Sequence, residues 1–525
     1  MADWDAIVIG AGHNGLAAGI ILAKAGWRVL VLERNEVPGG AVATAEVTLP
    51  GFHHDLFATN LNLFHNAPFY GEHQAELTAA GLEFLHVKRP YGSVFPDGEA
   101  LVVDTDLAAT KSEIARISEA DAEAWSEMVE EFERSAAYLF PALGAPLPSW
   151  TDLKTAIGAV SKLGREWPEE MLQRMLQPAR SFLTGRFESE KVQALAGAWS
   201  CHFDLAPDVA GGAFFTWLEN AGEQLNGSFI PKGGAARVID AMVKVLEANG
   251  GTLRCGAPVA EVEVEKGRAH GVKLEDGEIV ACSRAVIANL APTKLFGPIV
   301  REGLAQEFLQ KVKRYQYGTG TLVMHLALSG LPDWRAGARL RDVFMVHIGP
   351  TLDDMALAHQ RALAGLLPER PFLAVSQPTA IDPSRAPEGQ HVLWVMARMV
   401  ASRLRGDAEG EIEATSWEMA KQAFADRIMA MLEEHAPGIG AKVLGRAVFS
   451  PEDLESHNPN LVGGNLTCGT IQPMQYFFMR PFPGWSNYHT PIERLYLCGA
   501  ATWPGPGTGA GPGRLLGQML AAGRY

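Results

Sequence analysis

The glycine-rich segment near the start of the chain has the residue types and the spacing of a phosphate-binding turn. Gly10, Gly12 and Gly15 form the pattern G-x-G-x-x-G, between an apolar run at 5–9 and helix-forming residues at 14–25. In such a turn the first glycine permits the tight bend, the second lets backbone approach a pyrophosphate, and the third lets the helix pack against the sheet. Backbone N–H groups and the dipole at the helix start favour bound phosphate. The segment therefore predicts a dinucleotide-binding site.

An acidic residue follows at the distance that such a site requires. Glu33 ends the apolar run at 28–32 and lies 23 positions after Gly10, close to the usual spacing of about 20 residues. Its carboxylate can accept hydrogen bonds from ribose hydroxyls, and its negative charge disfavours the 2′-phosphate of NADP. Both FAD and NAD fit these residues.

Three further features of the sequence favour FAD over NAD. Gly39 and Gly40 offer a second place where backbone can come close to a cofactor. Residues 252–289 alternate between short apolar runs and turns, which predicts hairpins rather than a second nucleotide-binding half. The chain ends with an apolar run at 495–500, a glycine-rich stretch at 503–513 and a helical segment at 514–522, which a long flavin cofactor could use together with the first turn.

Flavin chemistry needs no protein nucleophile, but it does need a base where a hydroxyl, amine or C–H proton leaves the substrate. The candidates for this base are His53, His54, Asp55, His202, Tyr317 and His325. Each histidine among them could equally be a buried structural imidazole. Spacings typical of metal sites, such as H-x-x-x-H and H-E-x-x-H, do not occur in the sequence, so no metal is expected.

Several motifs together carry a resemblance to a known family. They are the segments 9–16, 39–44, 50–52, 463–465, 480–485 and 496–499, which read IGAGHNGL, GGAVAT, PGF, GGN, RPFPGW and YLCG. With these motifs the chain resembles the bacterial-type phytoene desaturase superfamily of FAD oxidoreductases. Within it, the chain is most similar to the branch of flavin-type carotenoid ketolases and the pyridine nucleotide-disulfide oxidoreductase domain-containing protein 2 group. The resemblance spans both ends of the chain.

This resemblance implies FAD as a non-covalently bound cofactor. It places the first glycine turn at the pyrophosphate, Glu33 at the adenosine ribose, Val259 near the adenine, and the C-terminal glycine-rich stretch near the ribityl chain and the flavin ring. The full set of expected FAD-binding residues is Gly10, Gly12, His13, Asn14, Gly15, Glu33, Arg34, Gly39, Gly40, Ala41, Val42, Val259, Asn289, Gly499, Ala500, Thr508, Gly509 and Ala510.

The chain departs from the common pattern of this family close to the expected flavin ring. Relatives often carry His-Pro-Gly-Gly-Gly-Val where residues 503–508 read WPGPGT, Gly-Arg-Asn where residues 513–515 read GRL, and Arg where Ala41 stands. We therefore expect Trp503 to border the flavin ring. With His54, Tyr317 and His325 it forms the set of catalytic candidates.

The function implied by these features is that of an FAD-dependent oxidoreductase that oxidises a hydrophobic small molecule by hydride transfer to flavin. The reaction is either a desaturation or an oxidation at a carbon bearing a hydroxyl or amine group. An oxygen-using alcohol or amine oxidase is the alternative among enzymes. From another class, a flavin-free prenyl-binding escort protein shares this fold, but the complete glycine pattern and Glu33 argue against it.

Composition and charge narrow the cellular setting. The 525 residues include 45 basic and 60 acidic side chains, for a net charge of −15, which argues against a nucleic acid partner. The five cysteines are scattered without a C-x-x-C pair, which is typical of a reducing compartment. The apolar start carries Asp3 and Asp5 instead of a basic signal sequence. We expect a cytoplasmic protein; peripheral membrane contact and the oligomeric state are left open.

The elements that must position these residues predict an α/β fold. We expect a Rossmann-like FAD-binding domain, of the two-dinucleotide-binding-domain flavoprotein type, built from 1–75, 228–296 and 445–525. An α+β substrate domain is expected from 76–227 and 297–444. In it, runs at 320–328, 371–376 and 392–399 predict an antiparallel sheet that forms the floor of a substrate tunnel. Helical periodicity predicts helices at 118–140 and about 411–435.

Overall fold

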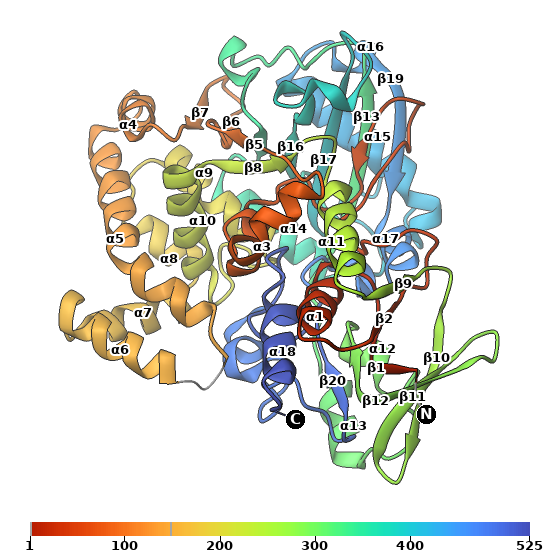
Figure 1. Ribbon diagram of the computed structural model, residues 1–525. Helices are drawn as coiled ribbons and strands as arrows, with labels where there is room; N and C mark the ends of the chain where they lie inside the picture. Colours follow the sequence, from red (N-terminus) through yellow and green to blue (C-terminus); the bar gives the residue numbers. More distant parts are fainter. Residues whose placement is uncertain (1–2, 147–149, 525) are drawn as a thin grey trace.

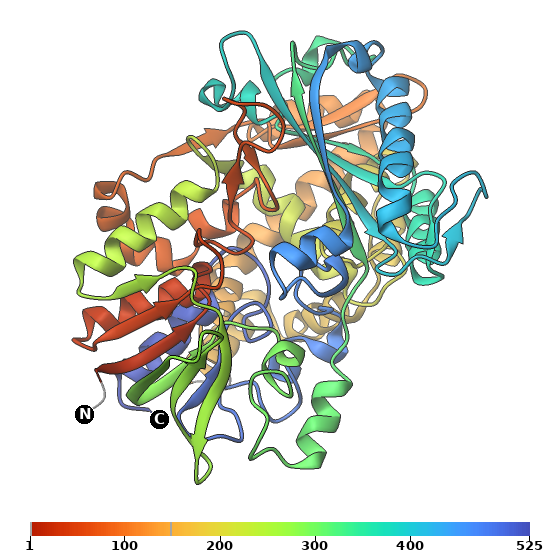
Figure 2. The same ribbon diagram turned by 90° about the vertical axis from the view of Figure 1, so that its right-hand side faces the viewer.

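A computed structural model describes residues 3–146 and 150–524 of the chain. Two sheets and a lobe of helices make up the molecule (Figures 1 and 2). The first sheet lies in the lower part of both views, together with both ends of the chain. The second sheet lies in the upper part, and the helical lobe stands beside the two.

The first sheet is a parallel Rossmann-type sheet with an attached hairpin. Its parallel strands stand in the order β9 (Thr252–Arg254), β2 (Val29–Leu32), β1 (Trp4–Ile9), β12 (Ile279–Ala288) and β20 (Leu495–Leu497). Strand β12 is shared, since its first half pairs antiparallel with β11 (Arg268–Leu274), which pairs in turn with β10 (Val259–Glu265). The short apolar runs of β1 and β2 are buried, as is usual for strands covered on both faces. The predicted fold class is confirmed.

Helices from the two ends of the chain pack together on this sheet. They are α1 (His13–Lys24) and α18 (Gly511–Ala521), with α11 (Ala236–Ala248) beside α1. The close approach depends on glycine: a Cβ at Gly513 would lie 1.9 Å from the carbonyl oxygen of Asn14. A side chain at this position would push α18 away from the first glycine turn. The C-terminal segment is therefore an integral part of the nucleotide-binding region.

The second sheet has seven strands. Their order is β19 (Val443–Phe449), β13 (Gly320–Leu328), β17 (His391–Val400), β16 (Phe372–Ser376), β14 (Met345–Ile348), β6 (Tyr91–Val94) and β7 (Ala100–Val103). Neighbours are antiparallel except β14 and β6, which run parallel. The runs predicted as antiparallel strands are β13, β16 and β17. The predicted domain boundary at 445 falls inside β19, which hydrogen-bonds to β13.

The two faces of the second sheet have different partners because side chains alternate along a strand. In β17, Leu393 and Val395 pack in one core with Trp417 and Phe424 of α15 (Trp417–His435), which covers the outer face (Figure 2). The next side chains, Trp394 and Met396, face the helical lobe and the cavity described below. The helix predicted from 411 begins at Trp417 instead, because the Ser416 side chain accepts a hydrogen bond from Met419 N and caps it.

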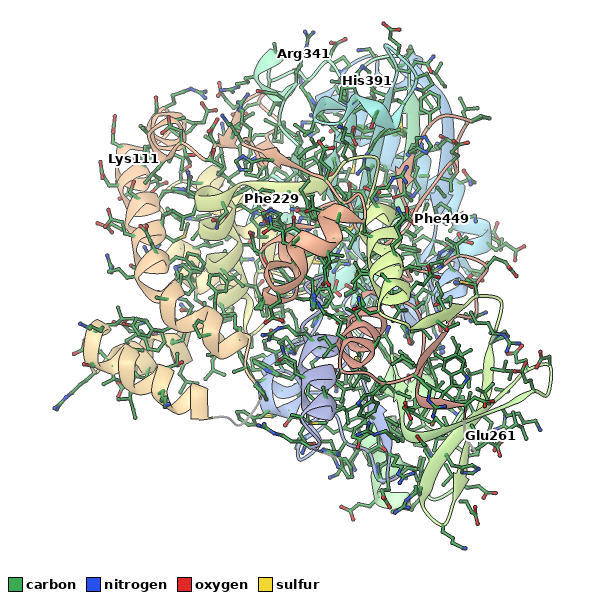
Figure 3. The ribbon with its side chains drawn as sticks, viewed as in Figure 1. Lys111, Phe229, Glu261, Arg341, His391 and Phe449 are labelled. Atoms are coloured by element: carbon green, nitrogen blue, oxygen red, sulfur yellow. The ribbon has the colours of Figure 1, made fainter. Side chains whose placement is uncertain are left out.

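The helical lobe comes from residues 107–226, which lie in the sequence between β7 of the second sheet and β9 of the first sheet. Its helices are α4 (Leu107–Ala115), α5 (Glu119–Leu143), α6 (Trp150–Leu163), α7 (Trp167–Leu176), α8 (Ala179–Thr184), α9 (Glu190–His202) and α10 (Gly212–Asn226). Helix α5 is the predicted amphipathic helix, and the Ser118 side chain caps it by accepting from Asp121 N. Figure 3 places Lys111 at the outer edge of this lobe and Glu261 on the β10–β11 hairpin at the opposite corner of the view.

Short elements connect these layers. The helices are α2 (Asn62–His65), α3 (Pro68–Ala79), α12 (Pro292–Leu295), α13 (Gln306–Lys313), α14 (Leu352–Leu363), α16 (Ile439–Lys442) and α17 (Pro451–His457). The strands pair as β3 (Thr44–Ala45) with β4 (His54–Asp55), β5 (Phe84–Val87) with β8 (Ser228–Pro231), and β15 (Leu366–Leu367) with β18 (Gly406–Asp407). The 3-10 turns are η1 (Ala338–Leu340), η2 (Pro378–Ala380), η3 (Pro383–Arg385), η4 (Val462–Gly464), η5 (Pro473–Gln475) and η6 (Phe477–Met479). Within the described ranges 3–146 and 150–524, none of the helices combines the length and the apolar character needed to cross a bilayer.

Candidate functional site

One cavity of about 710 Å³ connects the first glycine turn with the second sheet. Its volume lies in the range of small-molecule and cofactor sites. At one end it is lined by the turn after β1, the ends of β2 and β12, and the loop at 257–260. At the other end it reaches side chains of α9, α10, β14 and β17. The cavity thus runs from the predicted cofactor-binding residues to the second sheet and to helices α9 and α10.

The first glycine turn is built to receive phosphate. Gly12 is the N-cap of α1 and has no side chain to cap the helix, so the first N–H groups of α1 have no partner within the helix. Gly12 bridges Gly39, whose N–H donates to the carbonyl oxygen of Ala11 at 3.1 Å, which brings the two glycine segments side by side. The Asn14 Oδ1 and Thr508 Oγ1 atoms are buried without a hydrogen-bond partner among the residues that the structure describes, and both residues line the cavity. These unpaired polar groups fit a dinucleotide.

Glu33 is fixed in the position expected for a ribose-binding carboxylate. Its Oε2 atom accepts from Ala11 N at 2.9 Å, and its Oε1 atom accepts from Asn35 N at 3.0 Å. The side chain is buried and lines the cavity. A carboxylate has further lone pairs for the hydroxyls of a ribose. The geometry therefore fits the role that the sequence predicts for Glu33.

His13 connects the first glycine turn with the C-terminal glycine-rich stretch. Its Nε2 atom lies 3.1 Å from the carbonyl oxygen of Gly507 and 3.0 Å from Asn14 Nδ2. Burial lowers the pKa of His13 to about 4, so the imidazole is neutral at pH 7. The contact holds together two segments that are almost 500 residues apart in the sequence.

Nearly all of the predicted FAD-binding residues line this one cavity; the exceptions are Gly15, Gly509 and Ala510. Gly15 supports the turn from below, since a Cβ there would lie 2.2 Å from the Gly10 carbonyl oxygen. Gly509 lies against Leu63, and Ala510 is the buried N-cap of α18. The structure brings the predicted set together from both ends of the chain, and the contact of each residue with FAD stays a prediction.

The four catalytic candidates have a different placement, because none of them lines the cavity. Trp503 is buried and its indole N–H donates to the Ala145 carbonyl oxygen at 2.7 Å, so its polar edge points into the protein. Tyr317 is hydrogen-bonded to Thr293 Oγ1. His54 lies 2.8 Å from Thr48 Oγ1, and its ring packs edge-on against His325, which is fully buried in β13. The contacts of these four side chains are therefore with other protein groups and not with the cavity.

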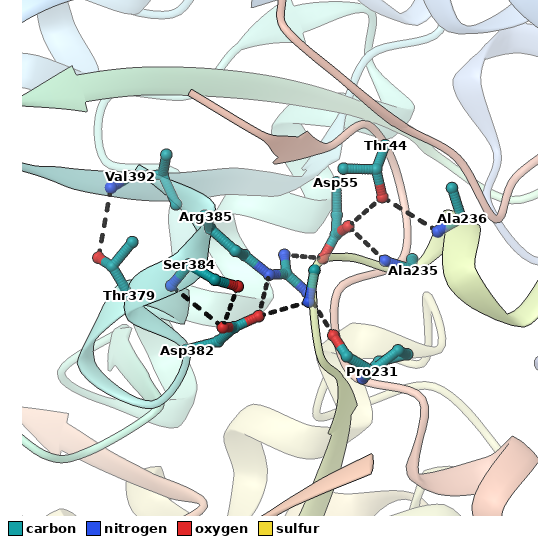
Figure 4. Close-up of polar contacts among 11 residues, drawn as sticks. Thr44, Asp55, Pro231, Ala235, Ala236, Thr379, Asp382, Ser384, Arg385 and Val392 are labelled. Atoms are coloured by element: carbon teal, nitrogen blue, oxygen red, sulfur yellow. Dashed lines mark hydrogen bonds and ion pairs between the residues drawn. The ribbon is translucent and has the colours of Figure 1, made fainter. Parts of the chain in front are cut away.

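Asp55, a further candidate for the base, is fully engaged in a buried ion-pair network (Figure 4). Its carboxylate accepts from Thr44 Oγ1 and Ala235 N, each at 2.7 Å, and pairs with Arg385 at 2.5 Å. Arg385 also contacts Asp382 and donates to the Pro231 carbonyl oxygen. The network joins the β3–β4 hairpin, the start of α11 and turn η3. It connects segments that are far apart in the sequence, and Asp55 is not free to act as a base.

Of the base candidates from the sequence, His202 is the one that lines the cavity. Its Nε2 atom lies 3.0 Å from His347 Nε2, and burial lowers the pKa of both rings, that of His347 to about 3. Both imidazoles are therefore neutral at pH 7. Arg398 also lines the cavity there, but Asp204 holds it at 2.6 Å in a second buried ion pair.

Sequence reasoning missed two carboxyl groups that line the cavity. Glu219 and Glu223 lie on α10 and are both buried. Burial, together with the neighbouring Glu223, raises the pKa of Glu219 to about 8, and burial raises the pKa of Glu223 to about 7. The available signal was a pair of glutamates four residues apart within the otherwise apolar and neutral segment 212–226.

The raised pKa of Glu219 makes the free energy of unfolding depend on pH. The folded protein holds a proton on Glu219 up to about pH 8, whereas the unfolded chain releases it near pH 4.5, so stability falls as the pH rises between these values. We expect Glu219→Gln to remove this loss. Between pH 6 and pH 8 the variant should gain about 2 kcal/mol relative to the unsubstituted protein. Urea titrations at both pH values measure this gain; an equal difference at both would contradict the prediction.

Comparison with known proteins gives the family. The family model for flavin containing amine oxidoreductases matches residues 15–508. The mouse pyridine nucleotide-disulfide oxidoreductase domain-containing protein 2 is 30% identical, covering 98% of this chain and 92% of that protein. A neurosporene-forming phytoene desaturase of Cereibacter sphaeroides is 26% identical, covering 96% and 91%. The structure of an oxidoreductase from Methanosarcina mazei superimposes with a TM-score of 0.63 at 19% identity, covering 98% and 99%.

These matches confirm the family resemblance seen in the sequence motifs. They span nearly the whole chain, including both segments that form the nucleotide-binding region. They favour an enzyme over the flavin-free escort protein considered above. The chain belongs to the flavin containing amine oxidoreductase family, and it is an FAD-dependent oxidoreductase.

Proposed function

We propose that this oxidoreductase oxidises an apolar small molecule by hydride transfer to the flavin. The reaction is a desaturation or an oxidation at a carbon bearing a hydroxyl or amine group. The observation that carries the proposal is the continuation of the cavity, beyond the predicted cofactor-binding residues, into a chamber with predominantly apolar walls. We call this part the apolar chamber; its apolar lining is Trp199, Phe203, Met345, Trp394, Met396 and Leu466, and Glu219 and Glu223 also line it.

In this proposal one end of the cavity binds the cofactor and the other end binds the substrate. Glu33 and the first glycine turn are placed to hold the adenosine and pyrophosphate of FAD. When bound, FAD supplies the two-electron acceptor. The walls of the apolar chamber bind a substrate by removing its apolar surface from water, at about 25 cal/mol per Å². They also exclude water from the reacting carbon. A relative named as a phytoene desaturase supports an apolar substrate.

Anaerobic reduction of the bound flavin tests the proposal without presuming an electron acceptor. FAD-loaded protein is mixed with a polyene, a medium-chain alcohol, a medium-chain amine and a sugar, and the visible flavin absorption is followed. We expect bleaching by at least one of the first three and none by the sugar. Bleaching by the sugar alone would contradict the proposal. Admitting air afterwards shows whether oxygen accepts the electrons, as in an oxidase.

A matched pair of variants connects the reaction with the apolar chamber. Met396→Gln places a polar amide in the wall, so flavin reduction by the apolar compound should slow by roughly tenfold. The flavin content should not change, because Met396 belongs to β17 of the second sheet and not to the segments predicted to bind FAD. Met419→Gln makes the same exchange at an exposed position of α15 and should have no effect. Equal rates in the two variants would place the reaction outside this chamber.

A further inference from the structure

Two glutamates face the apolar chamber without a role in the chemistry described above. Glu219 and Glu223 lie four residues apart on α10 and therefore point from the same side of the helix. Glu219 is 9% exposed and Glu223 is 1% exposed, and both line the cavity. A buried carboxyl group lowers stability unless it is paired or protonated. The surroundings of the two glutamates show how each meets this requirement.

Glu223 is held by the protein itself. Its Oε1 atom accepts from Asn60 Nδ2 and Asn62 Nδ2, both at 3.2 Å, and its Oε2 atom accepts from Ser228 Oγ at 2.5 Å. These donors come from the loop before α2, from the first residue of α2 and from β8, so Glu223 connects α10 with both of these neighbouring segments. These contacts occupy three of its roughly four acceptor positions, and its charge acts on the Glu219 carboxyl group beside it.

Glu219, in contrast, accepts no hydrogen bond from any residue in the described ranges 3–146 and 150–524. Arg398, a cation that lines the same cavity, is paired with Asp204 at 2.6 Å. His202 is neutral because burial keeps its pKa low. The carboxyl group of Glu219 is therefore nine-tenths buried, unpartnered and directed toward the cavity that it lines.

Two further polar groups of the chamber also have no partner. The indole N–H groups of Trp199 and Trp394 are buried without an acceptor in the described part of the chain, and both residues line the same cavity. A purely hydrocarbon ligand would leave all three polar groups unpaired. A ligand with a polar head group, by contrast, could pair with Glu219 and accept from an indole. Most of the chamber wall is apolar, but each of these three groups can form a hydrogen bond with a ligand.

We propose that Glu219 binds the hydrogen-bond-donating head group, a hydroxyl or an ammonium, of an otherwise apolar substrate. This inference rests on the proposed function and narrows it, since it makes Glu219 the residue that selects polar-headed substrates over hydrocarbons. The raised pKa of Glu219 agrees with this role. Burial and the neighbouring Glu223 make a negative charge on Glu219 unfavourable unless a proton or a hydrogen-bond donor pairs with it.

Binding calorimetry on the FAD-loaded protein tests the inference independently of turnover. The probes are octylamine, 1-octanol, heptyl methyl ether, which is an isomer of octanol without a donor, and octane. At pH 9, above the pKa of about 8 of Glu219, the carboxylate accepts hydrogen bonds but donates none, so octylamine and 1-octanol should bind the unsubstituted protein roughly tenfold more tightly than the ether and octane. Glu219→Leu should remove this preference. Glu219→Gln keeps an acceptor without the charge, so octanol binding should persist while octylamine binding weakens by roughly tenfold.

The controls separate the inference from the proposed function. Glu247→Gln, at an exposed position of α11, should bind all four probes like the unsubstituted protein. Equal affinities of the four probes, or unchanged octylamine and octanol binding in Glu219→Leu, would overturn the role of Glu219 while leaving an apolar substrate in place. If none of the probes binds, both proposals fail. If Glu219→Leu does not fold, unchanged octylamine affinity in Glu219→Gln is the result that overturns the inference.

Discussion

Gly12→Val should release FAD from the protein, weakening its binding by roughly a hundredfold or more. Gly12 has φ −74°, so glycine is required here for space and not for backbone conformation. A Cβ at this position would already lie 3.1 Å from Asn289 Nδ2, and the two methyl groups of valine would extend over the free N–H groups at the start of α1. Losing two hydrogen bonds to a charged phosphate costs about 1.5–3 kcal/mol each, and each 1.4 kcal/mol is a factor of about ten.

Flavin content after purification and the affinity for added FAD measure this effect. Gly71→Val is the matched control, because Gly71 lies in helix α3, is exposed, and would place its Cβ in open space. Gly12 is the N-cap of α1 and Gly71 lies in the first turn of α3, so an unspecific effect of valine near a helix start would be seen in both variants. A Gly12→Val protein that keeps a full complement of FAD would show that the pyrophosphate is bound elsewhere.

Arg385→Met should lower the free energy of unfolding by about 3–5 kcal/mol. The guanidinium group is fully buried and pairs with Asp55 and Asp382, whose side chains are almost as inaccessible (Figure 4). Methionine fills a similar volume but leaves two carboxylates buried without their cation. We expect the destabilisation to be greatest at the β3–β4 hairpin and at the start of α11, because the Asp55 carboxylate connects these two segments.

Urea denaturation of both proteins gives this difference directly. Arg341→Met serves as the control, because Arg341 is two-thirds exposed and lies 3.5 Å from Asp333; an exposed pair of this kind contributes about 0–1 kcal/mol. Adding Asp55→Asn to Arg385→Met should recover part of the loss, since it removes one of the stranded charges. Equal losses for the two arginine variants would mean that the buried network contributes little to stability.

Local patterns were enough to predict the nucleotide-binding region. The turn from Gly10 to Gly15 and the acid at Glu33 are close in sequence, and their geometry follows from the strand–turn–helix unit that contains them. The C-terminal stretch could be added because its own apolar strand ends in glycine, and α18 does pack on α1. Alternating apolar runs likewise predicted β13, β16 and β17, and Ser118 marked the start of α5.

The second part of the cavity could not be predicted from local patterns. It depends on tertiary contacts between α9, α10 and β17, which no spacing in the sequence encodes. His54 and Asp55 follow the Gly39–Gly40 segment closely and were therefore candidates for chemistry, but long-range partners such as Arg385 bury them. Glu219 was not predicted as a site residue, for the opposite reason. An acidic residue on a helix usually faces solvent, but the packing of α10 directs the Glu219 side chain inward.

A crystal structure of the FAD-loaded protein with 1-octanol or octylamine would show the positions of cofactor and ligand together. We expect the adenine at Val259, the adenosine ribose at Glu33, the pyrophosphate over Gly12, and the flavin ring facing the apolar chamber with the ligand head group at Glu219. Flavin density outside this cavity, or a ring turned away from Trp199 and Trp394, would contradict this placement.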